Sequence, residues 1–177
     1  MAELAKALLV DDRRDNLIAL EAILQGLPVQ AVAVESGEAA LKQLLTDDFA
    51  VILLDASMPN MDGFETATHI KQRERTRHIP IIFLTALNYD ARLAFRGYQI
   101  GAVDFITKPF DPWVLRSKVA VFIELWLKSA ELTARAVERM ALHEALSKAL
   151  TLLGAGDHEG AAIALREAQA RYGRVRV

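Results

Sequence analysis

The stretch AVILLD, residues 50–55, is apolar at every position except its last, which is an aspartate. A continuous apolar run of this length is typical of a strand that is covered on both faces, as in a parallel sheet. Two further runs, ALLV at residues 7–10 and IPIIFL at residues 79–84, have the same character. The first 110 residues therefore contain three strands that we expect to be fully buried.

Two less uniform β-type runs, at residues 29–34 and 102–106, bring the number of expected strands to five. Helical patterns separate them near residues 14–26, 37–46, 63–75 and 89–100. Strands that alternate with helices predict an α/β fold, here a doubly wound five-stranded parallel sheet. In such sheets ligands bind beyond the carboxyl ends of the strands, which directs attention to the residues found there.

Short polar and charged residues follow the expected strands: Asp11, Asp12, Asp55, Thr85 and Lys108. Three carboxylates at one edge of a sheet repel one another unless a cation or a basic group balances them. Carboxylate oxygens suit Mg²⁺ or Mn²⁺, the lysine adds a mobile positive charge, and the threonine adds a hydroxyl. This set of groups fits phosphoryl transfer, in which positioning and charge neutralisation supply most of the catalysis.

Composition narrows the class of protein further. There is no cysteine, which excludes disulfides, thiolate metal sites and cysteine nucleophiles. A net charge of −2 argues against nucleic acid as a partner. No signal peptide is apparent, and no apolar run approaches the ~20 residues that a membrane helix needs. We therefore expect a cytoplasmic protein that is not associated with membranes.

Four motifs occur in order, with the appropriate element between each pair. They are LLVDD at residues 8–12, ILLDASMPNMDG at 52–63, PIIFLTA at 80–86 and GAVDFITKPF at 101–110. Over roughly residues 5–125 the chain resembles the receiver domain of bacterial response regulators. The resemblance implies a flavodoxin-like receiver fold and a place in two-component signalling.

By that resemblance, Asp55 is the phosphoacceptor and takes its phosphoryl group from a histidine kinase. Asp12 and Asp55 would bind Mg²⁺ (or Mn²⁺) together with the backbone carbonyl of Ser57, and Asp11 would act through water. Lys108 would pair with the phosphoryl group. The residues themselves leave a simpler interpretation open, in which the two neighbouring aspartates cap the following helix.

The resemblance also implies a switch. Thr85 would move to bond the phosphoryl group, and the aromatic ring of Phe105 would swing inward with it. A cis peptide bond would precede Pro109. Thr85 as an ordinary helix cap and Phe105 as a plain core residue remain the alternatives from the residues alone. Leu87, like Ser57, is a position that tunes the phosphoryl lifetime in the family.

After Pro109 the pattern changes. Asp111 and Pro112 form a good helix start, and residues 113–153 contain neither glycine nor proline. We expect an extended fifth helix and a last short helix at 158–171, so that residues 1–127 form the receiver and 128–177 a helical extension. Leucines recur at one heptad position, which favours a coiled-coil dimer, whereas the glycines at 154 and 156 favour a helical hairpin.

Three functions compete. The leading one is a receiver, not an enzyme, whose phosphorylation switches protein–protein contact or oligomerisation through the helices after Pro109, with no DNA-binding output domain. The second is a haloacid-dehalogenase-type phosphohydrolase. In such enzymes a second aspartate stands two residues after the nucleophile, where this chain has Ser57. The third is a constitutive oligomerisation scaffold.

Overall fold

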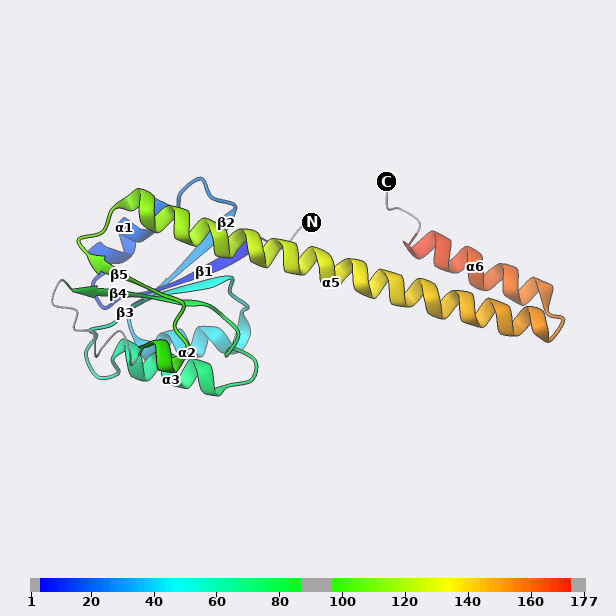
Figure 1. Ribbon diagram of the computed structural model, residues 1–177, viewed down its shortest axis with the longest axis horizontal. Helices are drawn as coiled ribbons and strands as arrows, with labels where there is room; N and C mark the ends of the chain where they lie inside the picture. Colours follow the sequence, from blue (N-terminus) through cyan, green and yellow to red (C-terminus); the bar gives the residue numbers. More distant parts are fainter. Residues whose placement is uncertain (1–3, 87–96, 173–177) are drawn as a thin grey trace. The chain divides into compact units, whose positions relative to one another are not determined.

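A five-stranded, all-parallel sheet forms the centre of the first part of the chain (Figure 1). The computed structural model describes residues 4–86 and 97–172. The strands are arranged in the order β2-β1-β3-β4-β5, and their bounds are β1 Ala5–Val10, β2 Val29–Val34, β3 Val51–Asp55, β4 Ile81–Ala86 and β5 Asp104–Lys108. The doubly wound α/β fold predicted from the sequence is thereby confirmed.

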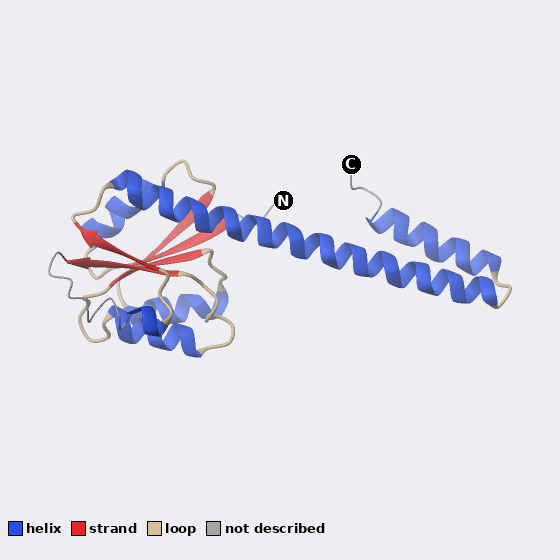
Figure 2. Cartoon of the chain, in the orientation of Figure 1, coloured by secondary structure: helices blue, strands red, loops and turns tan. Residues whose placement is uncertain are grey.

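Helices cover both faces of this sheet (Figure 2). Because successive side chains of a strand point to opposite faces, Leu8 and Leu9 of β1 enter different clusters of core residues. One cluster contains side chains of α2 (Gly37–Thr46) and α3 (Gly63–Gln72), and the other contains side chains of α1 (Arg14–Leu24) and the first turns of α5. Strands β1, β3 and β4 are buried on both faces, which is why their sequences are continuously apolar.

Strands β4 and β5 begin and end two residues later than predicted. Ile79 and Ala102 are buried without belonging to a strand, so their apolar character reflects packing and not strand pairing. At the other end, the parallel ladder continues to the pair formed by Ala86 and Lys108. Polar residues that were expected just beyond the strands therefore lie within their last two positions, where the sheet itself fixes their direction.

The predicted helix at residues 63–75 is also shorter, because α3 ends at Gln72. Beyond it the chain turns, and the Lys71 ammonium group donates hydrogen bonds to the carbonyls of Arg77 and Ile79. Asp62 caps the start of α3 by accepting a hydrogen bond from the Glu65 amide. Of the predicted helix 89–100, residues 89–96 lie outside the described residues, and 97–100 are helical.

The chain divides into two compact units, Met1–Leu127 and Lys128–Val177. Helix α5 runs from Pro112 to Gly154, and the Asp111 carboxylate accepts a hydrogen bond from the Trp113 amide at its start, as the sequence predicts. In the second unit α6 (His158–Tyr172) runs back alongside the end of α5 (Figure 1). The extended fifth helix and the C-terminal helical hairpin are thus both present.

Candidate functional site

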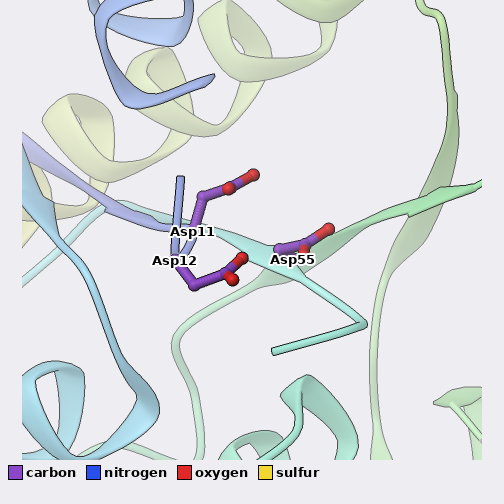
Figure 3. A group of neighbouring side chains, drawn as sticks. All are labelled: Asp11, Asp12 and Asp55. Carbon is purple, nitrogen blue, oxygen red and sulfur yellow. The ribbon is translucent and has the colours of Figure 1, made fainter. Parts of the chain in front are cut away.

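Three carboxylates meet at the carboxyl end of two neighbouring strands (Figure 3). Asp11 and Asp12 directly follow β1, and Asp55 is the last residue of β3, which pairs with β1. One carboxylate oxygen from each residue lies within 4.8 Å of the others. Asp11 and Asp55 are buried and Asp12 is exposed, so the cluster opens to solvent on one side. These oxygens are placed to hold a divalent cation, whose hard acid character suits carboxylate ligands.

Lys108 brings a positive charge to the same place from the end of β5. Its ammonium group donates hydrogen bonds to Asp11 Oδ2 at 2.7 Å and to Asp55 Oδ1 at 2.8 Å. The peptide bond between Lys108 and Pro109 is cis, as the resemblance implied. A single lysine therefore bridges two carboxylates that are far apart in the sequence, and it partly neutralises both.

Asp11 has a further partner that sequence reasoning missed. The side-chain amide of Asn16, in the first turn of α1, donates to both carboxylate oxygens of Asp11 at 2.8 and 2.9 Å. The backbone amide of Arg13 donates to Asp11 Oδ1 at 3.0 Å. These bonds fix the Asp11 carboxylate. The only signal in the sequence is an asparagine five residues after the first aspartate, which carries little information by itself.

The electrostatics of the site show an excess of negative charge. Burial raises the pKa of Asp55, and the charges of Asp11 and Asp12 act in the same direction, although Lys108 opposes them. Burial tends to lower the pKa of Lys108, but hydrogen bonds from its ammonium group to Asp11 and Asp55 outweigh this and raise it. One lysine thus does not fully compensate three carboxylates, and a bound cation would relieve the remaining repulsion.

Thr85 lies in β4, which adjoins β3, and its side chain is buried. Its hydroxyl oxygen has no hydrogen-bond partner among the described residues. A buried hydroxyl without a partner costs about 1–3 kcal/mol, so such groups are rare in folded proteins unless a ligand satisfies them. Among the described residues the hydroxyl is therefore left without a group that satisfies it.

Phe105 lies in β5 and is half-buried, with its ring turned toward the core. The ring stacks on Phe83 with centroids 5.3 Å apart and meets Tyr98 edge-on at 5.0 Å. Phe83 in turn stacks on Phe64 of α3 at 4.7 Å. A Cβ atom on Gly97 would lie 2.2 Å from the tip of the Phe105 ring, so the glycine leaves the space that the ring occupies. Four aromatic rings thereby link α3 to the residues around β5.

The loop after β3 contains the remaining predicted site residue. Ser57 is exposed and lies two residues beyond Asp55. Leu87 lies outside the described residues. Gly63 has a role that was not predicted: a Cβ atom there would lie 2.2 Å from the carbonyl oxygen of Asp55. The start of α3 therefore packs directly on the backbone of Asp55, which only glycine permits.

Comparisons with known proteins agree on one family. The pattern that defines the response regulator receiver domain matches residues 7–120. Response regulator PleD of Caulobacter vibrioides is 37% identical over 131 residues, which cover 74% of this chain and 29% of PleD. A probable cyclic di-GMP phosphodiesterase of Vibrio cholerae is also 37% identical, over 66% of this chain and 26% of that protein. The chain thus spans less than a third of these relatives.

Solved structures give the same result for the fold. The signal receiver domain of a signal transduction histidine kinase from Syntrophus aciditrophicus is 34% identical and superposes with a TM-score of 0.62. The match covers 68% of this chain and 90% of that domain. Among the helices that the structure describes, none is both long and apolar enough to cross a membrane.

Proposed function

The chain belongs to the response regulator receiver family, and from that membership we propose that Asp55 accepts a phosphoryl group from a histidine kinase. Receiver domains bind Mg²⁺ through an acidic cluster, and three carboxylates of this chain are placed to hold a metal. We assign Asp12, Asp55 and the backbone carbonyl of Ser57 as ligands, with Asp11 acting through water. Mg²⁺ held there would neutralise charge on the phosphoryl oxygens.

The transfer itself uses one bond made and one bond broken. A carboxylate oxygen of Asp55 attacks the phosphorus of a phosphohistidine whose other ring nitrogen carries a proton. The phosphorus–nitrogen bond breaks, its electron pair stays on that nitrogen, and the neutral imidazole leaves. Lys108, which now bridges two carboxylates, moves its ammonium group to a phosphoryl oxygen. The carboxylate must be ionised to attack, and the hydrogen bond from Lys108 favours that state against the effect of burial.

One observation supports this proposal most strongly. Among the described residues the Thr85 hydroxyl is buried without a partner near the end of β4, which pairs with the strand that ends in Asp55, and Lys108 bridges two of the three clustered carboxylates. A purely structural ion cluster has no need of an unsatisfied hydroxyl near the end of the neighbouring strand. A phosphoryl group on Asp55 supplies acceptor oxygens for both the hydroxyl and the ammonium group.

We propose further that the output is a change in contacts with a protein partner, in the cytoplasm and without a nucleic-acid ligand. Movement of Thr85 toward the phosphoryl group would open space beneath the neighbouring ring of Phe105. The stack of Phe64, Phe83, Phe105 and Tyr98 would then rearrange as a unit, because its rings touch in sequence. The affected surface would comprise the residues around Tyr98, strand β5 and the start of α5.

The test uses acetyl phosphate as a small phosphodonor. The whole chain is incubated with it and Mg²⁺, and its intact mass is measured. We expect one added phosphate in the wild type and none in Asp55→Asn or in the presence of EDTA. Asp48→Asn, which changes an exposed carboxylate, is the matched control and should be phosphorylated normally. Absence of phosphate from the wild type, or equal labelling of Asp55→Asn, would refute the proposal.

A further inference from the structure

The C-terminal hairpin buries its small residues and exposes its large ones. Within the described part of the second unit, every buried side chain is an alanine: Ala149, Ala161, Ala164 and Ala168. Alanines allow α5 and α6 to approach closely, but they bury little apolar surface. The hairpin therefore uses a narrow interface to hold two helices together, and its larger apolar residues face elsewhere.

Those larger residues form a stripe along α5. Leu142, Leu146, Leu150 and Leu153 are spaced by four, four and three positions, which places them on one side of a helix. Their exposed fractions are 42%, 48%, 69% and 43%. Together they leave as much apolar surface in water as two fully exposed leucines. Scattered exposed leucines are ordinary, but a continuous row of four indicates an interaction surface.

We propose that this leucine stripe, residues 142–153, binds the same stripe of a second copy of the chain, with the two α5 helices antiparallel and crossing at Leu146. In this arrangement Leu142 of one copy lies level with Leu150 of the other. Leu153 lies level with Arg139, whose methylene groups can cover it. The inference goes beyond the proposed phosphotransfer, because it concerns residues of the second unit, and it can fail while phosphorylation of Asp55 stands.

Charges on either side of the stripe determine the orientation. Arg135 and Arg139 lie before it, whereas Asp157 and Glu159 lie after it, in or just beyond the turn that leads into α6. A parallel pair would place each arginine level with the same arginine of the other copy. An antiparallel pair instead brings Arg135 of one copy level with Asp157 of the other, with Arg139 one turn away from that level. Opposite charges then meet at both ends of the seam.

Arg135 and Asp157 can each bind a second partner. Arg135 forms an exposed ion pair with Glu131 of its own helix, but a guanidinium group has five donors. Asp157 accepts the Gly160 amide through one oxygen and retains the other. From Arg135 to the turn the seam is about 30 Å long, at 1.5 Å per residue. Such a two-helix contact is at the small end of specific interfaces, so we expect a reversible dimer.

Sedimentation of the whole chain over a concentration series tests the surface. We expect the wild type and Asp55→Asn to dimerise alike, and Leu146→Glu to weaken the dimer at least tenfold. Val137→Glu is the matched control, because Val137 is exposed on another side of α5 and should tolerate the charge. A wild type that stays monomeric, or equal weakening by both substitutions, would overturn the inference. Circular dichroism verifies that both variants remain helical.

Cross-linking tests the orientation independently, since the chain contains no cysteine of its own. In the antiparallel pair Leu146→Cys lies at the crossing point and should form a disulfide between copies. Leu132→Cys should not, because the two copies of that position would be about 40 Å apart at 1.5 Å per residue. A parallel seam would cross-link both variants, and that result would refute the proposed geometry.

Discussion

Replacing Asp55 with asparagine should make the receiver unit more stable when no divalent cation is present. The substitution keeps the shape of the side chain and an oxygen that can accept from Lys108, but it removes one of three clustered negative charges. At the 4.8 Å limit that bounds the cluster, two unit charges repel by about 3 kcal/mol for an effective dielectric constant of about 20. Attraction to Lys108 and the exposure of Asp12 reduce this, so we expect a net gain of about 1 kcal/mol.

Mg²⁺ should reverse the order of stability. At a concentration one hundred times its dissociation constant, a ligand that binds only the folded state stabilises a protein by about 2.7 kcal/mol. The wild type should gain close to that amount. Asp55→Asn lacks one charged ligand and should gain much less. The two unfolding curves therefore exchange places between EDTA and saturating Mg²⁺.

The pH dependence of stability provides a second check that the charge of Asp55 causes the difference. Because the pKa of Asp55 is raised in the folded state, folding is favoured while Asp55 is protonated. That contribution is complete below the pKa of the unfolded chain, about 3.9, and is lost as the pH rises through the folded-state pKa. The advantage of Asp55→Asn in EDTA should therefore be full near pH 7 and should vanish toward pH 4.

Tryptophan fluorescence during urea unfolding is the appropriate assay. The chain has two tryptophans, Trp113 and Trp126, and both lie in the first unit. Trp126 lies in α5 and packs against the core of the first unit, so its emission reports on the unfolding of the receiver. Glu21→Gln, which changes an exposed carboxylate on α1, is the control and should have little effect. If Asp55→Asn were no more stable than the wild type in EDTA, the argument from crowded carboxylates would be wrong.

Three further substitutions test single contacts. Thr85→Val should stabilise the unphosphorylated protein by about 1 kcal/mol, because it removes a buried hydroxyl that has no partner among the described residues. Treatment with acetyl phosphate should then change the urea unfolding of this variant less than it changes that of the wild type. Gly63→Ala should destabilise the protein by at least about 2 kcal/mol, since the added Cβ atom would meet the backbone of Asp55. Gly154→Ala is the control, because no atom lies within 4 Å of the added Cβ atom there, and thermal unfolding compares the two variants. Asn16→Ala should weaken Mg²⁺ binding severalfold in a fluorescence titration, because the Asp11 carboxylate loses two hydrogen bonds.

The convergence of Asp55 and Lys108 could be predicted because parallel strands end at the same edge of a sheet. Continuously apolar sequences identified those strands without any structural information. The exact strand ends could not be predicted, since Ile79 is as apolar as a strand residue but packs from a loop. Contacts that depend on close approach, such as Gly63 against the backbone of Asp55, leave no distinctive pattern in the sequence.

The C-terminal unit illustrates the same limit. The leucine repeat in α5 predicted a seam, and the glycines near residue 154 predicted a hairpin, but the two features could not be reconciled from sequence. The structure contains the hairpin, in which α6 packs on alanines such as Ala149 and leaves leucines such as Leu146 exposed, and the seam stays a prediction. Alanines allow a second helix to pack closely but bury little apolar surface, so the sequence does not indicate which helix will cover them.

Chemical mapping of the phosphorylated residue tests the central claim most directly. The chain is treated with acetyl phosphate and Mg²⁺, the product is reduced with borohydride, which converts an aspartyl phosphate to homoserine, and the peptides are sequenced by mass spectrometry. We predict homoserine at position 55 and nowhere else, and none without the phosphodonor. Conversion at Asp11 or Asp12 instead, or no conversion at all in a folded, Mg²⁺-loaded protein, would contradict the assignment of Asp55 as the phosphoacceptor.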